Sequence, residues 1–171
     1  MHEARYPTTW TFNLDERTTH MSLVSTSPTQ PPVPATPPAI RNALSNFARS
    51  SSTQSDVVAL LDVSADLMEV SVIHYEFAAL AVDKALQALE LTIRLKVDQS
   101  AKAGMSRLIG TLRKDYALRP ELDELLRDVL HLRNSWVGHP RGAVTYSMVS
   151  AVGFLSHICA AIAEISDFDR H

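Results

Sequence analysis

Apolar residues recur every three or four positions from Asp56 toward the C-terminal part of the chain, and no stretch there alternates with the period of a strand. This pattern is typical of amphipathic α-helices. It predicts four helical segments, which cover residues 56–97, 102–116, 120–136 and 142–165. We therefore expect an all-α domain that is built as an antiparallel bundle of four to five helices.

The longest of these segments exceeds the size of a compact domain. At about 1.5 Å per residue, residues 56–97 would form a rod of roughly 63 Å, whereas a domain of this length has a radius of gyration of about 13 Å. We expect the break at Ser71-Val72-Ile73, where a polar residue precedes two β-branched ones. Gly104 and Gly110 are expected to interrupt the segment 102–116.

The last two segments carry clearer signals for their ends and faces. Pro120 fits the first position of a helix, and the acidic residues that follow it favour the positive end of the helix dipole. The final segment has one apolar face, made of Val144, Met148, Val152, Leu155, Ile158, Ile162 and Ile165. Cys159 lies within this segment, where we expect a small buried hydrophobe.

The N-terminal third of the chain has a different composition. Seven of the nine prolines lie in residues 1–38, and the run Ser27–Pro38 is expected to stay outside any helix or central strand. We expect a Pro/Ser/Thr-rich, largely irregular tail at residues 1–54 and a helical domain at residues 55–171. Within the tail, Thr8–Phe12 could form a short strand. The proline run suits either a solvated linker or a ligand for an aromatic groove.

Composition narrows the classes of function. A net charge of −3 excludes a generally basic nucleic-acid coat, and one Cys excludes a disulfide framework and a Cys-based zinc site. The first residues, Met-His-Glu-Ala-Arg, lack the apolar run of a signal peptide, and the longest apolar run, Phe77–Val82, is too short to span a bilayer. We expect a soluble cytoplasmic protein that needs no cofactor or metal.

Two charge patterns bear on function. Asp62, Glu69, Glu76, Asp83 and Glu90 recur every seven residues and form one acidic line. The line suits a solvated face, or one member (Glu76 or Asp83) turns inward to meet an arginine. Residues 94–119 hold seven basic and two acidic side chains, a local balance of +5. These bases either pair with the acidic line or form a rim that faces phosphates.

The strongest candidate for chemistry is Arg133. The third segment places Leu122, Leu125, Val129, Arg133 and Trp136 at steps of three or four residues, so that Arg133 lies on the apolar stripe. A guanidinium there must meet a carboxylate or line a cleft that receives an anion, because burying it unpaired is costly. His139-Pro140 follows on a turn near a helix N-terminus, which favours negative charge.

The motif Arg133-Asn134-Ser-Trp-Val-Gly-His139-Pro140 lies between a Leu-rich helix and a final amphipathic helix, downstream of the Ala/Leu-rich stretch Ala78–Glu90. In these features, residues 56–167 resemble the HEPN superfamily of nucleotide-binding domains. That family carries an arginine, four to six residues and a histidine, often with a polar residue directly after the arginine. The resemblance implies a HEPN-like bundle and does not cover the N-terminal tail.

Many members of this family are metal-independent endoribonucleases that act as toxins or in antiviral (phage) defence, and they form homodimers in which two motifs meet in one cleft. The resemblance implies that Arg133 holds the scissile phosphate, that His139 is the general acid or base for attack by the ribose 2′-OH, and that Asn134 orients the site. Further candidates for RNA contacts are Arg107, Arg113, Lys114, Trp136 and Arg141; core packing is the other role that suits Trp136.

Some features of the chain leave other functions open. A subgroup of the family has a tyrosine two residues after the histidine; here Arg141 occupies that position, and Tyr146 lies too far away, which puts modification by a cognate antitoxin in doubt. Other members are non-catalytic and bind RNA, nucleotides or a partner protein. A plain helical interaction protein with an accidental motif is the third possibility.

Two further expectations come from the apolar segments. Residues 72–82 are apolar nearly all round, and a helix of that kind needs cover on more than one side, which a small domain alone would supply only in part. A second copy of the chain is therefore expected to cover it. His74 and His157 lie in apolar runs and are expected to be satisfied core or interface groups rather than metal ligands.

Overall fold

The computed structural model describes residues 16, 22–23, 31, 33–45, 47–97, 103–138 and 148–168, with the backbone alone for residues 132, 134–138 and 148–149. This part of the chain contains a two-stranded antiparallel ribbon, β1 (Ser22–Leu23) and β2 (Val33–Pro34), with Leu23 opposite Val33. It also contains six helices: α1 (Pro37–Ser45), α2 (Ser55–Val70), α3 (Phe77–Val97), α4 (Met105–Asp115), α5 (Pro120–Gly138) and α6 (Met148–Ser166). The predicted helical bundle is confirmed, with six helices in place of four or five.

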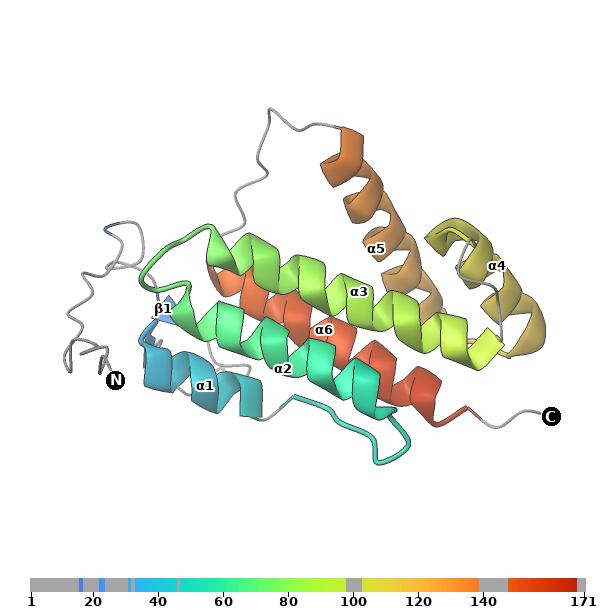
Figure 1. Cartoon of the computed structure of the whole chain (residues 1–171), viewed down its shortest axis with the longest axis horizontal. Helices are drawn as coiled ribbons and strands as arrows, with labels where there is room; N and C mark the ends of the chain where they lie inside the picture. Colours follow the sequence, from blue (N-terminus) through green and yellow to red (C-terminus); the bar gives the residue numbers. More distant parts are fainter. Residues whose placement is uncertain are drawn as a thin grey trace, which may run out of the picture.

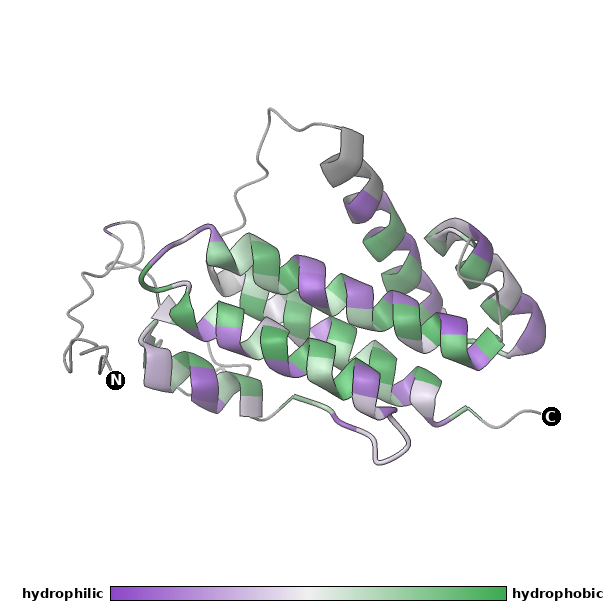
Figure 2. Ribbon diagram, viewed as in Figure 1, coloured by the Kyte–Doolittle hydropathy of each residue, from purple (hydrophilic) through white to green (hydrophobic). Residues whose placement is uncertain are grey.

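The core lies between the three helices α2, α3 and α6, which run alongside one another with α3 in contact with both of the others (Figure 1). Small and branched apolar side chains on α3 face these neighbours and are completely buried, among them Ala81, Ala85, Ala88, Leu89 and Ile93. Figure 2 shows the apolar residues concentrated along these helices. The alanines let the helix backbones approach closely, so that α3 becomes the central element of the fold.

The predicted break in the longest segment is confirmed. Residues 71–76 form a turn between α2 and α3. The hydroxyl of Ser71 donates a hydrogen bond of 2.6 Å to the carbonyl of Met68, and it thereby satisfies an acceptor at the end of α2. Val72 and Tyr75 are buried, which fixes the turn against the core. The two helices therefore fold back on each other instead of forming one rod.

The prediction that two glycines interrupt the segment 102–116 is wrong for Gly110. Gly104 precedes α4 as its N-cap, but Gly110 lies inside the helix, which runs without a break from Met105 to Asp115. A single glycine costs only about 1 kcal/mol in a helix. The burial of Met105, Leu108, Ile109 and Leu112 on one face outweighs that cost.

The last two helices follow their predicted patterns. α5 begins at Pro120 as expected. α6 begins at Met148, while residues 142–147, which include Val144, lie outside the described residues. The predicted apolar face of α6 is confirmed for Leu155, Ile158, Ile162 and Ile165, which are buried.

α1 overturns the expectation that the proline run stays outside helices. Pro37 and Pro38 are the first two residues of α1, where a helix leaves its backbone N–H groups without intrahelical partners, so that the missing donors cost nothing. Thr36 caps the helix, since its hydroxyl accepts a 3.4 Å hydrogen bond from the backbone N–H of Ala39. Ile40 and Leu44 are buried against the bundle. Packed structure thus begins well before the predicted boundary at residues 54/55, whereas Thr8–Phe12 lies outside the described residues.

Residues 72–82 are not the helix, apolar on all sides, from which a second subunit was expected. The first part of this segment is the turn and not a helix. Most of its apolar side chains are buried within the chain itself, and Leu80 is the large hydrophobe there that stays half exposed. This segment therefore needs no second copy for its cover, and the homodimer depends on the resemblance alone.

A substitution in α1 tests whether residues 37–45 belong to the cooperative domain. Ile40→Ala removes a fully buried side chain and should lower the free energy of unfolding by about 2–5 kcal/mol. The matched control is Val63→Ala on α2, because Val63 is 45% exposed; it should change the free energy by about 0.5 kcal/mol or less. Urea denaturation followed by circular dichroism measures both. Equal, small effects would mean that α1 is not packed on the bundle.

Candidate functional site

α5 carries the candidate arginine away from the core of the bundle. Its N-terminal half is fixed by the buried residues Leu122, Leu126 and Val129. Leu125, which was expected on the buried stripe, is only partly buried, because the true stripe runs through Leu126. The C-terminal end of α5 lies farther from α3 than its N-terminal end does (Figure 1). Arg133 lies on this second half, where its side chain is 39% exposed.

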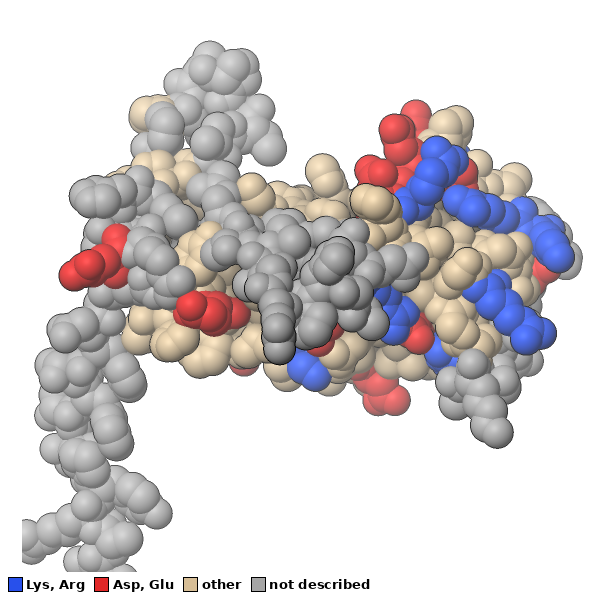
Figure 3. All heavy atoms as spheres, turned by 90° about the horizontal axis from the view of Figure 1, so that it is seen from above, with Lys and Arg blue, Asp and Glu red and all other residues tan. Residues whose placement is uncertain are grey.

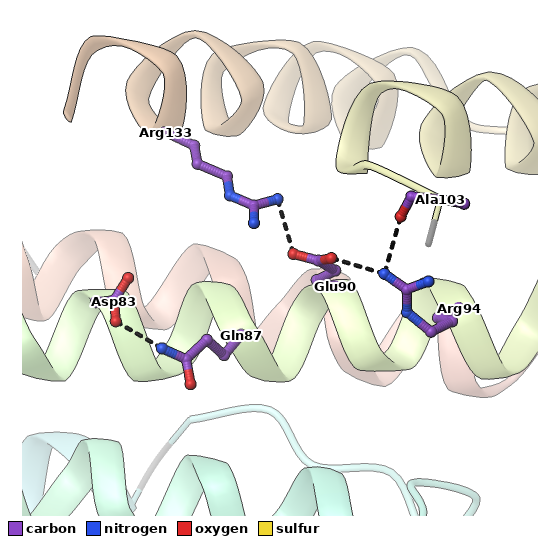
Figure 4. Close-up of polar contacts among 6 residues, drawn as sticks. All are labelled: Asp83, Gln87, Glu90, Arg94, Ala103 and Arg133. Atoms are coloured by element: carbon purple, nitrogen blue, oxygen red, sulfur yellow. Dashed lines mark hydrogen bonds and ion pairs between the residues drawn. The ribbon is translucent and has the colours of Figure 1, made fainter. Parts of the chain in front are cut away.

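Arg133 pairs with a carboxylate on α3. This is one of the two alternatives that the sequence predicted, the other being a cleft that receives an anion. Its Nη1 lies 2.7 Å from Oε2 of Glu90. The other oxygen of Glu90, Oε1, accepts a 2.8 Å hydrogen bond from Nη2 of Arg94, one helical turn further along α3. Nη2 of Arg94 also donates to the carbonyl of Ala103, two residues before α4 begins, at 2.9 Å. Figure 4 shows the Arg133 side chain reaching across from α5 to Glu90. We call Glu90, Arg94 and Arg133 the Glu90 cluster.

The charges of this cluster do not cancel. One carboxylate is shared by two guanidinium groups, which leaves a net charge of +1. Glu90 and Arg94 are only 20% and 18% exposed, so water screens them less than it screens the other ion pairs of the surface. A guanidinium has five N–H donors, and among the described residues only Glu90 pairs with Arg133. The cluster can therefore accept a further anion at the exposed side of Arg133.

Arg133 of α5 pairs with a different residue of the acidic line than the sequence predicted. The prediction named Glu76 or Asp83 as the residue that turns inward, and it is wrong, because Glu90 is the one that faces Arg133. Glu76 is more than half exposed and pairs with His74, while Asp83 accepts a 2.6 Å hydrogen bond from Gln87. At the other end, Asp62 pairs with Arg49, and Glu69 binds Arg41 of α1. The line is solvated in part and structural in part.

The four basic residues on α4 and directly after it divide into two groups. Arg113 pairs with Asp123 at 2.5 Å, and Arg119 pairs with Glu164. The hydrogen bond from Arg113 lowers the pKa of Asp123 below its usual value. Arg107 and Lys114 are exposed, lie two turns apart on α4 and have no carboxylate partner among the described residues. Lys and Arg side chains gather at the end of the molecule that carries α4 (Figure 3).

The remaining predicted site residues lie outside what the structure describes. This holds for His139 and Arg141, and for the side chains of Asn134 and Trp136. Arg133 is thus the one predicted catalytic residue whose side chain is placed. The structure instead adds Glu90 and Arg94, which were not predicted as site residues. Their spacing of four residues on one helix is a signal of a pair that the sequence carries.

Two other histidines are not core groups, which leaves the interface alternative as a prediction. His74 lies in the turn with its side chain mostly exposed, where it packs near the ring of Phe77 with centroids 5.4 Å apart, and His157 is exposed on α6. Cys159 is buried as expected, and burial raises the pKa of its thiol to about 11. A small cavity of about 60 Å³ lies elsewhere, between the start of α2 and the ends of α3 and α6, and includes no residue of the Glu90 cluster.

Searches for similar proteins provide no identification. The chain matches no protein-family model, no curated protein and no solved structure. Within the described ranges, no helix is long and apolar enough to cross a membrane. In the same residues, no three His, Cys, Asp or Glu side chains are grouped as a metal site would need.

Removing the shared carboxylate tests the cluster directly. Glu90→Gln removes the partly buried carboxylate that the two arginines share. We expect a loss of about 1–3 kcal/mol in the free energy of unfolding. Glu76→Gln is the matched control, because Glu76 belongs to the same acidic line but is well exposed; it should cost about 1 kcal/mol or less. Chemical denaturation at low salt measures the difference. If the two variants are equally stable, Glu90 does not hold the cluster.

Proposed function

We propose that the chain is a HEPN-type, metal-independent endoribonuclease that acts in the cytoplasm as a homodimer, in a toxin or phage-defence role. The observation that carries the proposal is the position of Arg133: a guanidinium on α5 whose side chain is 39% exposed, paired with one carboxylate in a cluster whose net charge, Arg133 included, is +1. Such a group suits a phosphate better than a core role, since a core arginine would be closed off from water.

In this proposal, each residue of the motif has a separate task. Arg133 binds the non-bridging oxygens of the scissile phosphate and stabilises the charge that develops on them. His139 takes the proton from the ribose 2′-OH or gives one to the leaving 5′-oxygen. The 2′-oxygen forms a bond to phosphorus while the bond to the 5′-oxygen breaks, which leaves a 2′,3′-cyclic phosphate and a 5′-hydroxyl. Asn134 orients the site, and Trp136 stacks on a base.

The basic surface of α4 supplies the RNA backbone contacts. Arg107 and Lys114 are the candidates best placed for this role, because they are exposed and have no carboxylate partner among the described residues. They lie seven residues, or roughly 10 Å, apart on one helix face. Arg113 is a weaker candidate, since its guanidinium already pairs with the carboxylate of Asp123. Arg141 follows His139 in the sequence and would add a contact near the reaction.

A non-catalytic module that binds RNA, a nucleotide or a partner protein is the second candidate function. The observation that favours it is the pairing of Arg133 with Glu90, which holds the guanidinium without any chemistry. Both candidates use the same positive site, but only the nuclease needs His139 as an acid or base. A cleavage assay therefore separates them.

The nuclease proposal predicts cleavage of single-stranded RNA in the presence of EDTA. Arg133→Ala and His139→Ala should each lower the rate at least about 100-fold, because one removes the phosphate cation and the other the acid or base. Arg127→Ala is the matched control, since Arg127 is also on α5 but pairs with Asp123 away from the Glu90 cluster; it should cleave at the wild-type rate.

Denaturing gels with end-labelled RNA measure these rates, and the ends of the products report the cyclic phosphate. Binding of RNA that depends on Arg133 but without cleavage by the wild type would favour the non-catalytic module. Cleavage at the same rate by the wild type and both variants would contradict the proposed site.

A further inference from the structure

The two arginines of the Glu90 cluster have different surroundings. Arg94 is 18% exposed and is held by two protein acceptors, Glu90 and the carbonyl of Ala103. Arg133 is about twice as exposed, comes from a different helix and pairs, among the described residues, with Glu90 alone. Arg94 is therefore fixed within the fold, whereas Arg133 is attached at one contact.

This difference decides which arginine can leave the carboxylate. Glu90 is mostly buried, and a carboxylate in that position is costly without a cation. If Arg133 moves to a phosphate, Arg94 still neutralises Glu90 and the hydrogen bond to its Oε1 remains. Without Arg94, Glu90 would have Arg133 as its one cation among the described residues, and the cost of breaking that pair would oppose binding of a phosphate.

We propose that Arg94 is a positioning residue, which retains Glu90 so that Arg133 can transfer its guanidinium from the carboxylate to a phosphodiester of RNA. The inference deepens the proposed function and rests on it, because the RNA phosphate is the anion that Arg133 receives. Arg94 itself stays on Glu90 and on the carbonyl of Ala103 in the complex. Through Ala103 it also ties the site to the start of α4, the helix that carries Arg107 and Lys114.

The alternative role for Arg94 is direct contact with the RNA. Its burial and its two protein acceptors argue against that role, because its Nη2 already donates to both of them. The two roles differ in one measurable way. A positioning residue acts only while Glu90 carries its charge, whereas a direct contact would be lost in any background.

A double-mutant cycle separates these roles. The probe is a single-stranded RNA oligonucleotide with 2′-O-methyl groups, which lacks the attacking hydroxyl, and its Kd is measured by fluorescence anisotropy. We expect Arg94→Gln to weaken binding about tenfold, which corresponds to about 1.4 kcal/mol, and Arg94→Lys to weaken it less, since a lysine keeps the charge beside Glu90. In the Glu90→Gln background, Arg94→Gln should cause no loss beyond that of the charge-matched control Arg127→Gln.

Arg127→Gln is the charge-matched control, because it removes one exposed arginine of α5 without touching Glu90. Any loss that Arg94→Gln shares with this control is general electrostatics and not positioning. Equal losses from Arg94→Gln with and without Glu90 would overturn the inference in favour of direct contact. No loss beyond the control would overturn it altogether.

Two further measurements separate failure of this inference from failure of the proposed function. If Arg133→Gln binds the probe as well as the wild type does, the proposed function fails at its phosphate site. If RNA binding depends on Arg133 but the double-mutant cycle shows no coupling between Arg94 and Glu90, only the proposed role of Arg94 is overturned. Without RNA, Arg94→Gln should raise the unfolding equilibrium constant about tenfold more than Arg133→Gln does, and equal effects would contradict the difference between the two arginines.

Discussion

The arrangement of the candidate site depends on the Glu90 carboxylate, which two arginines from different helices share. It connects α3, the central helix of the bundle, with α5, whose first half packs on the bundle through Leu122, Leu126 and Val129. Arg94 extends the connection to Ala103, two residues before the start of α4. Three helices are therefore connected around one mostly buried charge, and Arg133 adds a polar contact between the second half of α5 and α3.

A polar connection of this kind has a consequence for function. A side chain that packs among apolar neighbours stays buried. A guanidinium in a partly exposed ion pair can leave its carboxylate for another anion at a modest cost in free energy. The net charge of +1 that remains in the cluster favours such an exchange. The basic residues on and after α4 also differ in their surroundings. Arg113 and Arg119 pair with carboxylates of the fold, whereas Arg107 and Lys114 face solvent on α4.

Sequence periodicity was enough to predict most of the helices, the turn at residues 71–76 and the face of α6, because these features depend on local spacing and chain length. It failed for α1, whose prolines suit a helix start only because Ile40 and Leu44 find a place in the core. It also failed at Gly110, where burial outweighed propensity. The heptad spacing left open a solvated face or an inward-turning Glu76 or Asp83, and it missed Glu90, since the level at which α5 crosses α3 is set by tertiary packing. His139 stays a prediction.

The most direct test is a crystal structure of the protein bound to the 2′-O-methyl RNA oligonucleotide. We expect a guanidinium nitrogen of Arg133 at about 2.7–2.9 Å from a phosphate oxygen, with Glu90 retained by Arg94 alone and a second copy of the chain completing the cleft. A complex in which Arg133 remains on Glu90 while the RNA lies elsewhere would contradict the proposed site.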